Sequence, residues 1–313
     1  MAINKSSNEI WSAKQSYSGF ENRSFRFTDD MRPLFYKWLG ITPESYVLDA
    51  GCGTGVFARY LAADICGGHI DGFDINPGFI EYGQQKLREL GLADKVSIRL
   101  DDGYDLSCAD NTYDAVTNYT YIGVLSDPVA GLKEMIRVCK PGGVVSCVVA
   151  TNAIAPVRWQ GDYPFDGADE LQKLSYEESQ IFSRYARKVT DFNQSAEWHA
   201  FRYPKMFEVC GLENITMYPF AYTFNYNDQK YSFEYRRDLL MNEIRDEIGW
   251  LKARYEDKKD IYNEHGFDDA KLNRLLELMK IKLEYVSQNF ENDHSFEWVG
   301  GFNFVVTGVK PAS

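Results

Sequence analysis

The sequence has few of the residues that metal centres and disulfide frameworks require. Its six cysteines form no Cys-x-x-Cys pair, and its four histidines do not combine with them at a ligand spacing. Several of the cysteines lie in apolar runs, where Cys behaves as a small hydrophobe. We therefore expect a reduced, cytoplasmic protein without a structural metal.

Long apolar runs and regions of positive charge are also missing. No stretch of about 18 apolar residues occurs, so nothing is expected to span a membrane. The opening residues, MAINKSSNEIWSAK, lack the apolar centre of a secretory signal. The formal net charge is −12, and the basic residues are mixed with acids. This disfavours nucleic acid and anionic membranes as partners, since both are recognised by clustered positive charge.

Strand-like and helix-like segments alternate through the first half of the chain. Apolar runs at 45–51, 68–75, 95–102, 113–120 and 144–150 read as strands, and helical patterns lie between them. Asn76 and Pro77 have the residue types of a helix start, and a helix over 128–143 is expected to close with a Pro-Gly-Gly turn. This alternation predicts a Rossmann-like, doubly wound α/β fold, with the carboxyl ends of the parallel strands forming a ligand edge.

The second half is less regular and predicts insertions into the sheet domain. Residues 201–229 read as a core helix and strand, and 293–313 contain a last strand, in a sheet of seven mostly parallel strands. Residues 1–40 are expected to form N-terminal cap helices, and 41–150 the cofactor-binding core. Residues 151–200 lack a clear strand and are expected to cap the substrate. Residues 230–292 read as two helices split near Gly266, forming either a lid or a homodimer contact.

A glycine-rich loop follows the first strand in the stretch YVLDAGCGTG. Gly51, Gly53 and Gly55 let the backbone approach a ligand closely at the start of a helix. The third glycine comes one residue earlier than in the dinucleotide fingerprint G-x-G-x-x-G. Asp49 stands just before the loop, where a carboxylate would repel a pyrophosphate and attract a cation. A ligand with an ammonium group and a nucleoside, but no phosphate, fits this arrangement better.

VLDAGCGTG resembles motif I of the class I S-adenosylmethionine-dependent methyltransferases, and the later segments over about residues 40–150 agree with it in order. The resemblance implies S-adenosyl-L-methionine as cofactor and assigns roles by position. Asp74, followed by Ile75, would chelate the ribose hydroxyls. Asp102, with Asp101 as the alternative, and Gly103 would meet the adenine. The segment from Asn118 to Tyr121 would lie beside the methionine part. In the N-terminal stretch, Tyr17 and Arg23 are candidates for covering the cofactor, or they belong to an amphipathic helix packed on the sheet.

The fourth segment departs from the family pattern. Many small-molecule members carry Glu-His there, whereas this chain has Gly123 and Val124. The candidates for a general base are therefore His199 and Tyr121. The aromatic residues Trp159, Tyr163, Phe165 and Trp198 are expected either to line a substrate pocket together with Tyr121 or to pack in the core.

These features predict an enzyme that transfers a methyl group by in-line displacement to a small-molecule acceptor. The acceptor atom, whether O, N, S or C, stays open. The alternatives are a protein or RNA methyltransferase and a regulatory subunit that binds the cofactor without catalysis.

Overall fold

The computed structural model describes residues 21–150, 157–159, 163–186, 202–291 and 298–312. These residues divide into two compact units. The first comprises Met1–Pro156, Asp191–Tyr222 and Gly301–Ser313, and the second comprises Val157–Thr190 and Thr223–Gly300. Stretches far apart in the sequence, from both predicted insertions, thus belong to one unit. Each unit has its own core and is described by itself.

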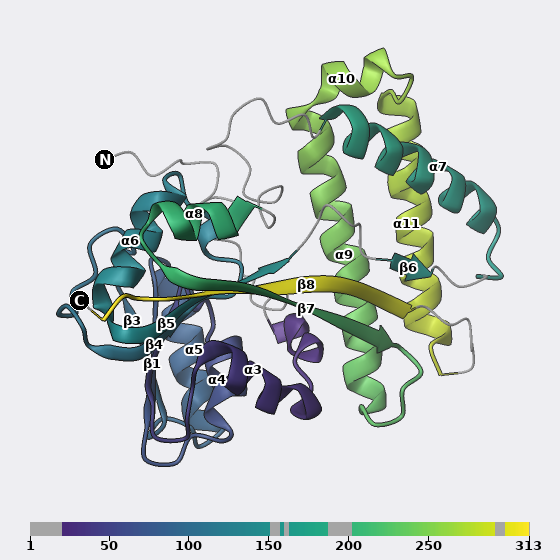
Figure 1. Ribbon diagram of the computed structural model, residues 1–313. Coiled ribbons are helices and arrows are strands. Elements are labelled where there is room, and N and C mark those ends of the chain that lie inside the picture. The colour runs from purple at the N-terminus through teal and green to yellow at the C-terminus, as the bar shows by residue number, and fades with distance from the viewer. Residues whose placement is uncertain (1–20, 151–156, 160–162, 187–201, 292–297, 313) are drawn as a thin grey trace. The chain divides into compact units, whose positions relative to one another are not determined.

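The first unit contains the predicted alternation of strands and helices (Figure 1). Its N-terminal part holds the short helices η1 (Asn22–Arg26) and η2 (Asp29–Met31) and the helix α3 (Arg32–Leu39). The strands are β1 (Tyr46–Ala50), β2 (His69–Asp74), β3 (Val96–Leu100), β4 (Tyr113–Thr117) and β5 (Cys139–Ala150). The helices between and after them are α4 (Val56–Ala62), α5 (Pro77–Glu89), η3 (Ile122–Val124), α6 (Pro128–Val138) and α8 (Tyr203–Val209).

The sheet has the strand order β3-β2-β1-β4-β5-β8-β6, and β7 (Glu213–Asn225) also pairs with β8 (Trp298–Val309). The strands from β3 to β5 pair in parallel, and β8 runs antiparallel to β5. The chain passes from β1 to one side through β2 and β3, then returns to the other side with β4. The point between β1 and β4 is therefore the switch point where doubly wound sheets bind ligands.

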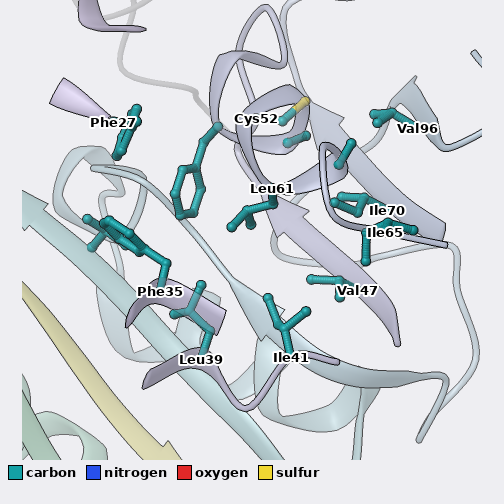
Figure 2. Close-up of a cluster of buried hydrophobic side chains, with 14 of the residues drawn as sticks. Phe27, Phe35, Leu39, Ile41, Val47, Cys52, Leu61, Ile65, Ile70 and Val96 are labelled. Atoms are coloured by element: carbon teal, nitrogen blue, oxygen red, sulfur yellow. The ribbon is translucent and has the colours of Figure 1, made fainter. Parts of the chain in front are cut away.

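Alternate residues of the strands pack into two apolar clusters, one on each face of the sheet. Val47 belongs to the cluster with α3, α4 and α5, whereas its neighbour Leu48 belongs to the cluster with α6 and α8. This follows from the period of two in a strand. Figure 2 shows the first cluster, with Phe27 of the N-terminal part beside Phe35 of α3. The sheet is thus covered on both faces, as a mostly parallel sheet requires.

Three local predictions were inaccurate. The helix expected over 128–143 ends at Val138, and the Pro-Gly-Gly turn lies inside β5. Gly142 takes a φ of +78° there, and the register with β4 shifts. A short strand, β6 (Val157–Trp159), adds an eighth strand next to β8 in a region where no strand was predicted. A third helix also lies in the block that was read as two.

The second unit consists mainly of helices. They are α7 (Ala168–Ile181), the π-helical turn η4 (Phe182–Ala186), α9 (Phe233–Asp257), α10 (Lys259–Glu264) and α11 (Asp269–Asn289). α9 and α11 run side by side, and α7 packs on α11 (Figure 1). The buried carboxylate of Glu178 accepts two hydrogen bonds from Arg254, each 2.8 Å, and one from the hydroxyl of Tyr262. A charge buried this deeply persists only when it is paired, so these contacts fix α7 to α9 and α10.

Candidate cofactor site

The glycine loop leaves the carboxyl end of β1, the strand beside the switch point. Gly51, Gly53 and Gly55 have φ values of +65°, +55° and +80°, a region that residues with a side chain rarely adopt. Gly55 is also the N-cap of α4. The amide of Cys52 donates to the carbonyl of Phe73 in β2, at 2.8 Å, which joins the loop to the neighbouring strand end. The three glycines are thus required by the backbone conformation itself.

Asp74 at the end of β2 is held against this loop. Its carboxylate accepts a hydrogen bond from the amide of Gly53, at 3.0 Å, and another from the amide of Asn76, at 2.9 Å. Asn76 in turn caps α5, as its position predicted. Burial raises the pKa of Asp74, while these backbone amides act in the opposite direction. Ile75 beside it is exposed. The acid and the loop therefore form one rigid element at the switch point.

Asp49 lies at the bottom of the site and is fully enclosed. It pairs with Gly72 of β2 and Thr117 of β4 in the sheet, and only 1% of its surface is exposed. Neither carboxyl oxygen has a hydrogen-bond partner of ordinary geometry among the described residues. Burial raises its pKa to about 8; the Ala58 amide opposes this shift, and the charge of Asp74 adds to it. A buried polar group without a partner is costly, and a cation supplied by a ligand would relieve that cost.

A small cleft opens onto Asp49. It is lined by Arg23, Asp49, Gly51, Cys52, Val56, Phe57 and Tyr119. Acidic and basic side chains thus border the same space beside the glycine loop. The cleft matches a zwitterionic group, because its ammonium needs an acidic partner and its carboxylate a basic one.

The two acids after β3 have different surroundings. The carboxylate of Asp101 accepts hydrogen bonds from the backbone and hydroxyl of Ser107 and is paired with Arg99. Asp102 is exposed and accepts a bond only from the amide of Tyr104 among the described contacts. The carboxylate of Asp101 is therefore already paired with groups of the protein, whereas that of Asp102 remains accessible to a ligand. This difference supports the choice of Asp102 over Asp101.

Asn118 follows β4 and is buried. Its side-chain amide donates to the carbonyl of Ser146, at 3.1 Å, and to the sulfur of Cys147, at 2.9 Å. Its side-chain oxygen accepts from the amide of Tyr121, at 3.3 Å. The side chain of Asn118 therefore holds the segment after β4 from within.

The ring of Tyr121 lies across the site itself. It packs edge-on against Phe73, with 5.7 Å between ring centres. A Cβ atom added to Gly51 would overlap this ring, and one added to Gly103 would overlap its hydroxyl. Burial raises the pKa of the Tyr121 phenol far above neutrality, so it is suited to donate a hydrogen bond and unsuited to act as a base. Tyr121 thus occupies space between two glycines that were predicted to contact the cofactor.

The structure describes only some of the remaining candidates. Tyr17, Trp198 and His199 fall outside the described residues. Trp159 belongs to β6, where only the backbone is described. Tyr163 is in the second unit, with Phe165 and Tyr285 around it and the Lys282 ammonium 4.8 Å from its ring centre.

Tyr119, which lies in the segment predicted to border the methionine part, lines the cleft. Sequence reasoning did not single out Phe57, which also lines the cleft, or Glu21 and Thr54, which contact each other at the glycine loop. Thr54 could have been noticed, because it stands inside the motif. Glu21 carried no signal, since an acid in a polar N-terminal stretch looks like any solvated residue.

Comparison with known proteins identifies the family of the chain. Residues 47–143 match the family described as a methyltransferase domain. The demethylmenaquinone methyltransferase of Lactiplantibacillus plantarum is 31% identical over 169 residues, which cover 50% of this chain and 71% of that protein. The protein of the same name from Bacteroides fragilis is 36% identical over 106 residues, which cover 34% of this chain and 43% of that protein.

A solved structure, the phosphoethanolamine N-methyltransferase 2 of Haemonchus contortus with S-adenosyl-L-methionine, is 16% identical. The similarity covers 97% of this chain and 60% of that one, with a TM-score of 0.49.

The doubly wound sheet, the glycine loop and the acids at the carboxyl ends of β1 and β2 define a class of cofactor-binding enzymes. The chain belongs to the class I S-adenosylmethionine-dependent methyltransferases, and it is a methyltransferase that uses S-adenosyl-L-methionine. Among the helices that the structure describes, none combines the length and low polarity needed to cross a membrane.

Proposed function

We propose that this methyltransferase modifies a small-molecule acceptor. The net charge of −12 supports the proposal, because clustered positive charge is what nucleic acids and anionic membranes require. The names of the sequence relatives also support it, since they act on demethylmenaquinone or in ubiquinone and menaquinone biosynthesis. The chain spans less than half of some of these relatives, so their acceptor is a starting point for assays.

The buried, unpartnered carboxyl group of Asp49 beside the glycine loop carries the cofactor assignment. In the proposed arrangement, Asp49 receives the ammonium of the cofactor and Arg23 its carboxylate. Asp74 holds the ribose hydroxyls, and Asp102 with Gly103 meets the adenine.

The backbone of Gly51, Gly53 and Gly55 lines the cofactor, with Ile75, Asn118 and Tyr17 at its borders. When bound, the cofactor would supply a sulfonium methyl group, whose carbon would bond to a lone pair of the acceptor as the bond to sulfur breaks and S-adenosylhomocysteine leaves.

The protein's contribution to this reaction is mainly alignment and exclusion of water. We propose that Trp159, Tyr163, Trp198 and Tyr121 contact the acceptor. His199 would accept a proton where the acceptor is a hydroxyl or an activated carbon. Tyr121, whose phenol stays protonated, would serve by donating a hydrogen bond.

The test uses a radiolabelled methyl donor and a cell extract separated by size. Label is expected in the fraction that passes an ultrafiltration membrane, with demethylmenaquinone as the first pure compound to try. Label in protein or RNA would refute the small-molecule assignment. Binding of S-adenosylhomocysteine without transfer to any fraction would favour a regulatory subunit.

Two further properties belong to the same proposal. All six cysteines lie in the described part of the chain and are free thiols. Free thiols support a reducing, cytoplasmic location, because disulfides persist in oxidising compartments. The helices of the second unit could act as a homodimer contact, which light scattering at several protein concentrations would test.

A further inference from the structure

A carboxylate just before η1 is bonded to the glycine loop and to the helix that follows it. Glu21 accepts two hydrogen bonds from Nη2 of Arg59 in α4, at 2.8 and 2.7 Å. It also accepts one from the hydroxyl of Thr54, at 3.1 Å. The Thr54 side chain is fully buried between Gly53 and Gly55, and the Arg59 side chain is only 9% exposed. Charge-assisted bonds in such a sheltered place are stronger than those of a surface ion pair.

The other end of the same segment is bonded to a residue that lines the cleft. Nη1 of Arg26 donates to the hydroxyl of Tyr119, at 2.8 Å, and Tyr119 lines the cleft. Phe27 follows, with its ring 4.9 Å from that of Tyr119 and 5.0 Å from that of Phe57 (Figure 2 shows Phe27 at the edge of this core). We call residues 21–27 the strap.

Arg23 lies between these two attachments and borders the cleft together with Asp49. With both ends of η1 held, the backbone that carries Arg23 has little freedom to move. The contacts of Glu21 thus determine where the Arg23 backbone stands relative to the glycine loop.

We propose that Glu21 is a positioning residue for the cofactor, acting through the strap to hold Arg23 at the cleft. The inference rests on the proposed role of Arg23 toward the cofactor carboxylate. Its energetic basis is preorganisation: a strap that is already ordered does not lose conformational entropy when the ligand binds. Without Glu21, that ordering has to occur during binding, and affinity falls.

The test is calorimetric titration with S-adenosylhomocysteine, which reports binding independently of turnover. Glu21→Ala and Arg23→Ala are each expected to raise the dissociation constant about tenfold. The double variant is expected to lose no more affinity than either single variant, because Glu21 acts through Arg23. Glu21→Gln keeps an acceptor for Thr54 and Arg59 and is expected to stay within about threefold of the wild type. In turnover assays, KM for the cofactor should rise while kcat is retained.

Glu89→Ala is the matched control. Glu89 pairs with Lys86 on the surface of α5, so its removal deletes the same charge without touching the strap, and affinity should not change. If the losses of Glu21→Ala and Arg23→Ala multiply in the double variant, Glu21 does not act through Arg23. If Glu21→Ala lowers the melting temperature but leaves the dissociation constant unchanged, Glu21 is merely structural. Either result overturns the inference.

Failure of the wild type to bind S-adenosylhomocysteine would instead refute the cofactor assignment itself. Should Glu21→Ala fail to fold, Glu21→Asp replaces it. The shorter side chain keeps the charge but cannot reach both partners, so the same loss of affinity is expected.

Discussion

Binding of the cofactor should release a proton from Asp49. In the free protein, burial raises the pKa of this carboxyl group to about 8, and neither of its oxygens has a hydrogen-bond partner of ordinary geometry among the described residues. At pH 7 about nine-tenths of the molecules therefore carry a protonated Asp49. An ammonium placed against the group favours its ionised form and lowers the pKa. About 0.9 proton per cofactor should then leave the protein at pH 7.

The size of the pH effect on affinity follows from the same pKa of Asp49. Deprotonating Asp49 at pH 7 costs about 1.4 kcal/mol, which weakens the observed affinity about tenfold relative to the alkaline limit. Between pH 6 and pH 8 the affinity should rise about fiftyfold, provided that the pKa in the complex lies well below 6. Titration calorimetry with S-adenosylhomocysteine in two buffers of different ionisation enthalpy measures the protons released directly.

Asp49→Asn is the control, because it keeps the shape of the side chain and removes its titration. The variant should bind weakly and without pH dependence. Without cofactor it should also gain thermal stability relative to the wild type as pH rises. The sign follows from linkage: a carboxyl group whose pKa is raised on folding favours the folded state at low pH. That contribution falls by about 1.4 kcal/mol per pH unit from its unfolded pKa until pH 8.

A pH-independent affinity with no proton release in the wild type would refute this reasoning. It would mean either that Asp49 is already ionised in the free protein or that it stays protonated in the complex.

Three further predictions concern single side chains. Asp74→Ala removes a charged hydrogen-bond acceptor and should weaken S-adenosylhomocysteine binding by about 1.5–3 kcal/mol. Asp74→Asn should lose less binding free energy. Unchanged affinity of Asp74→Ala in calorimetry would contradict the role of Asp74. Tyr121→Ala clears the space between Gly51 and Gly103 and should tighten S-adenosylhomocysteine binding, since the ring no longer has to move. Tyr121→Phe should keep most turnover, and a large loss of kcat would show that the hydroxyl takes part in the reaction. His199→Ala should lower kcat and leave the calorimetric affinity for the cofactor unchanged; equal turnover would remove His199 from the mechanism.

The site near β1 and β2 was accessible from sequence because its signals are local. Gly51, Gly53 and Gly55 stand at every second position of one short loop, and positive φ values account for their identity. Asn76 and Pro77 marked a helix start for equally local reasons. The boundary between α6 and β5 was predicted wrongly, because a Pro-Gly-Gly sequence usually forms a turn. Here the pairing of β5 with β4 resumes at Val144 after a register shift, and its pairing with β8 begins there, so tertiary contacts on either side override the local preference.

Contacts between distant segments could not be predicted in the same way. The Glu21 side chain meets Arg59 after 38 positions of sequence, and nothing in either stretch indicates the other. The choice between Asp101 and Asp102 also needed the structure, because only there is Asp101 seen to be occupied by Arg99 and Ser107. The ring of Tyr121 over Gly51 and Gly103 is a third case, in which the segment after β4 reaches back to loops after β1 and β3.

The class of fold and the kind of ligand follow from patterns that lie close together in the chain. The alternation of short apolar runs with helical patterns requires a sheet covered on both faces, and a glycine loop preceded by an acid attracts a cation rather than a phosphate. Only the tertiary structure decided that Asp49 lies without a partner at the bottom of a cleft and that the strap from Glu21 to Phe27 borders it. The physical reason is that desolvation and ion pairing depend on which distant segments surround a group, and neighbours in the chain do not specify them.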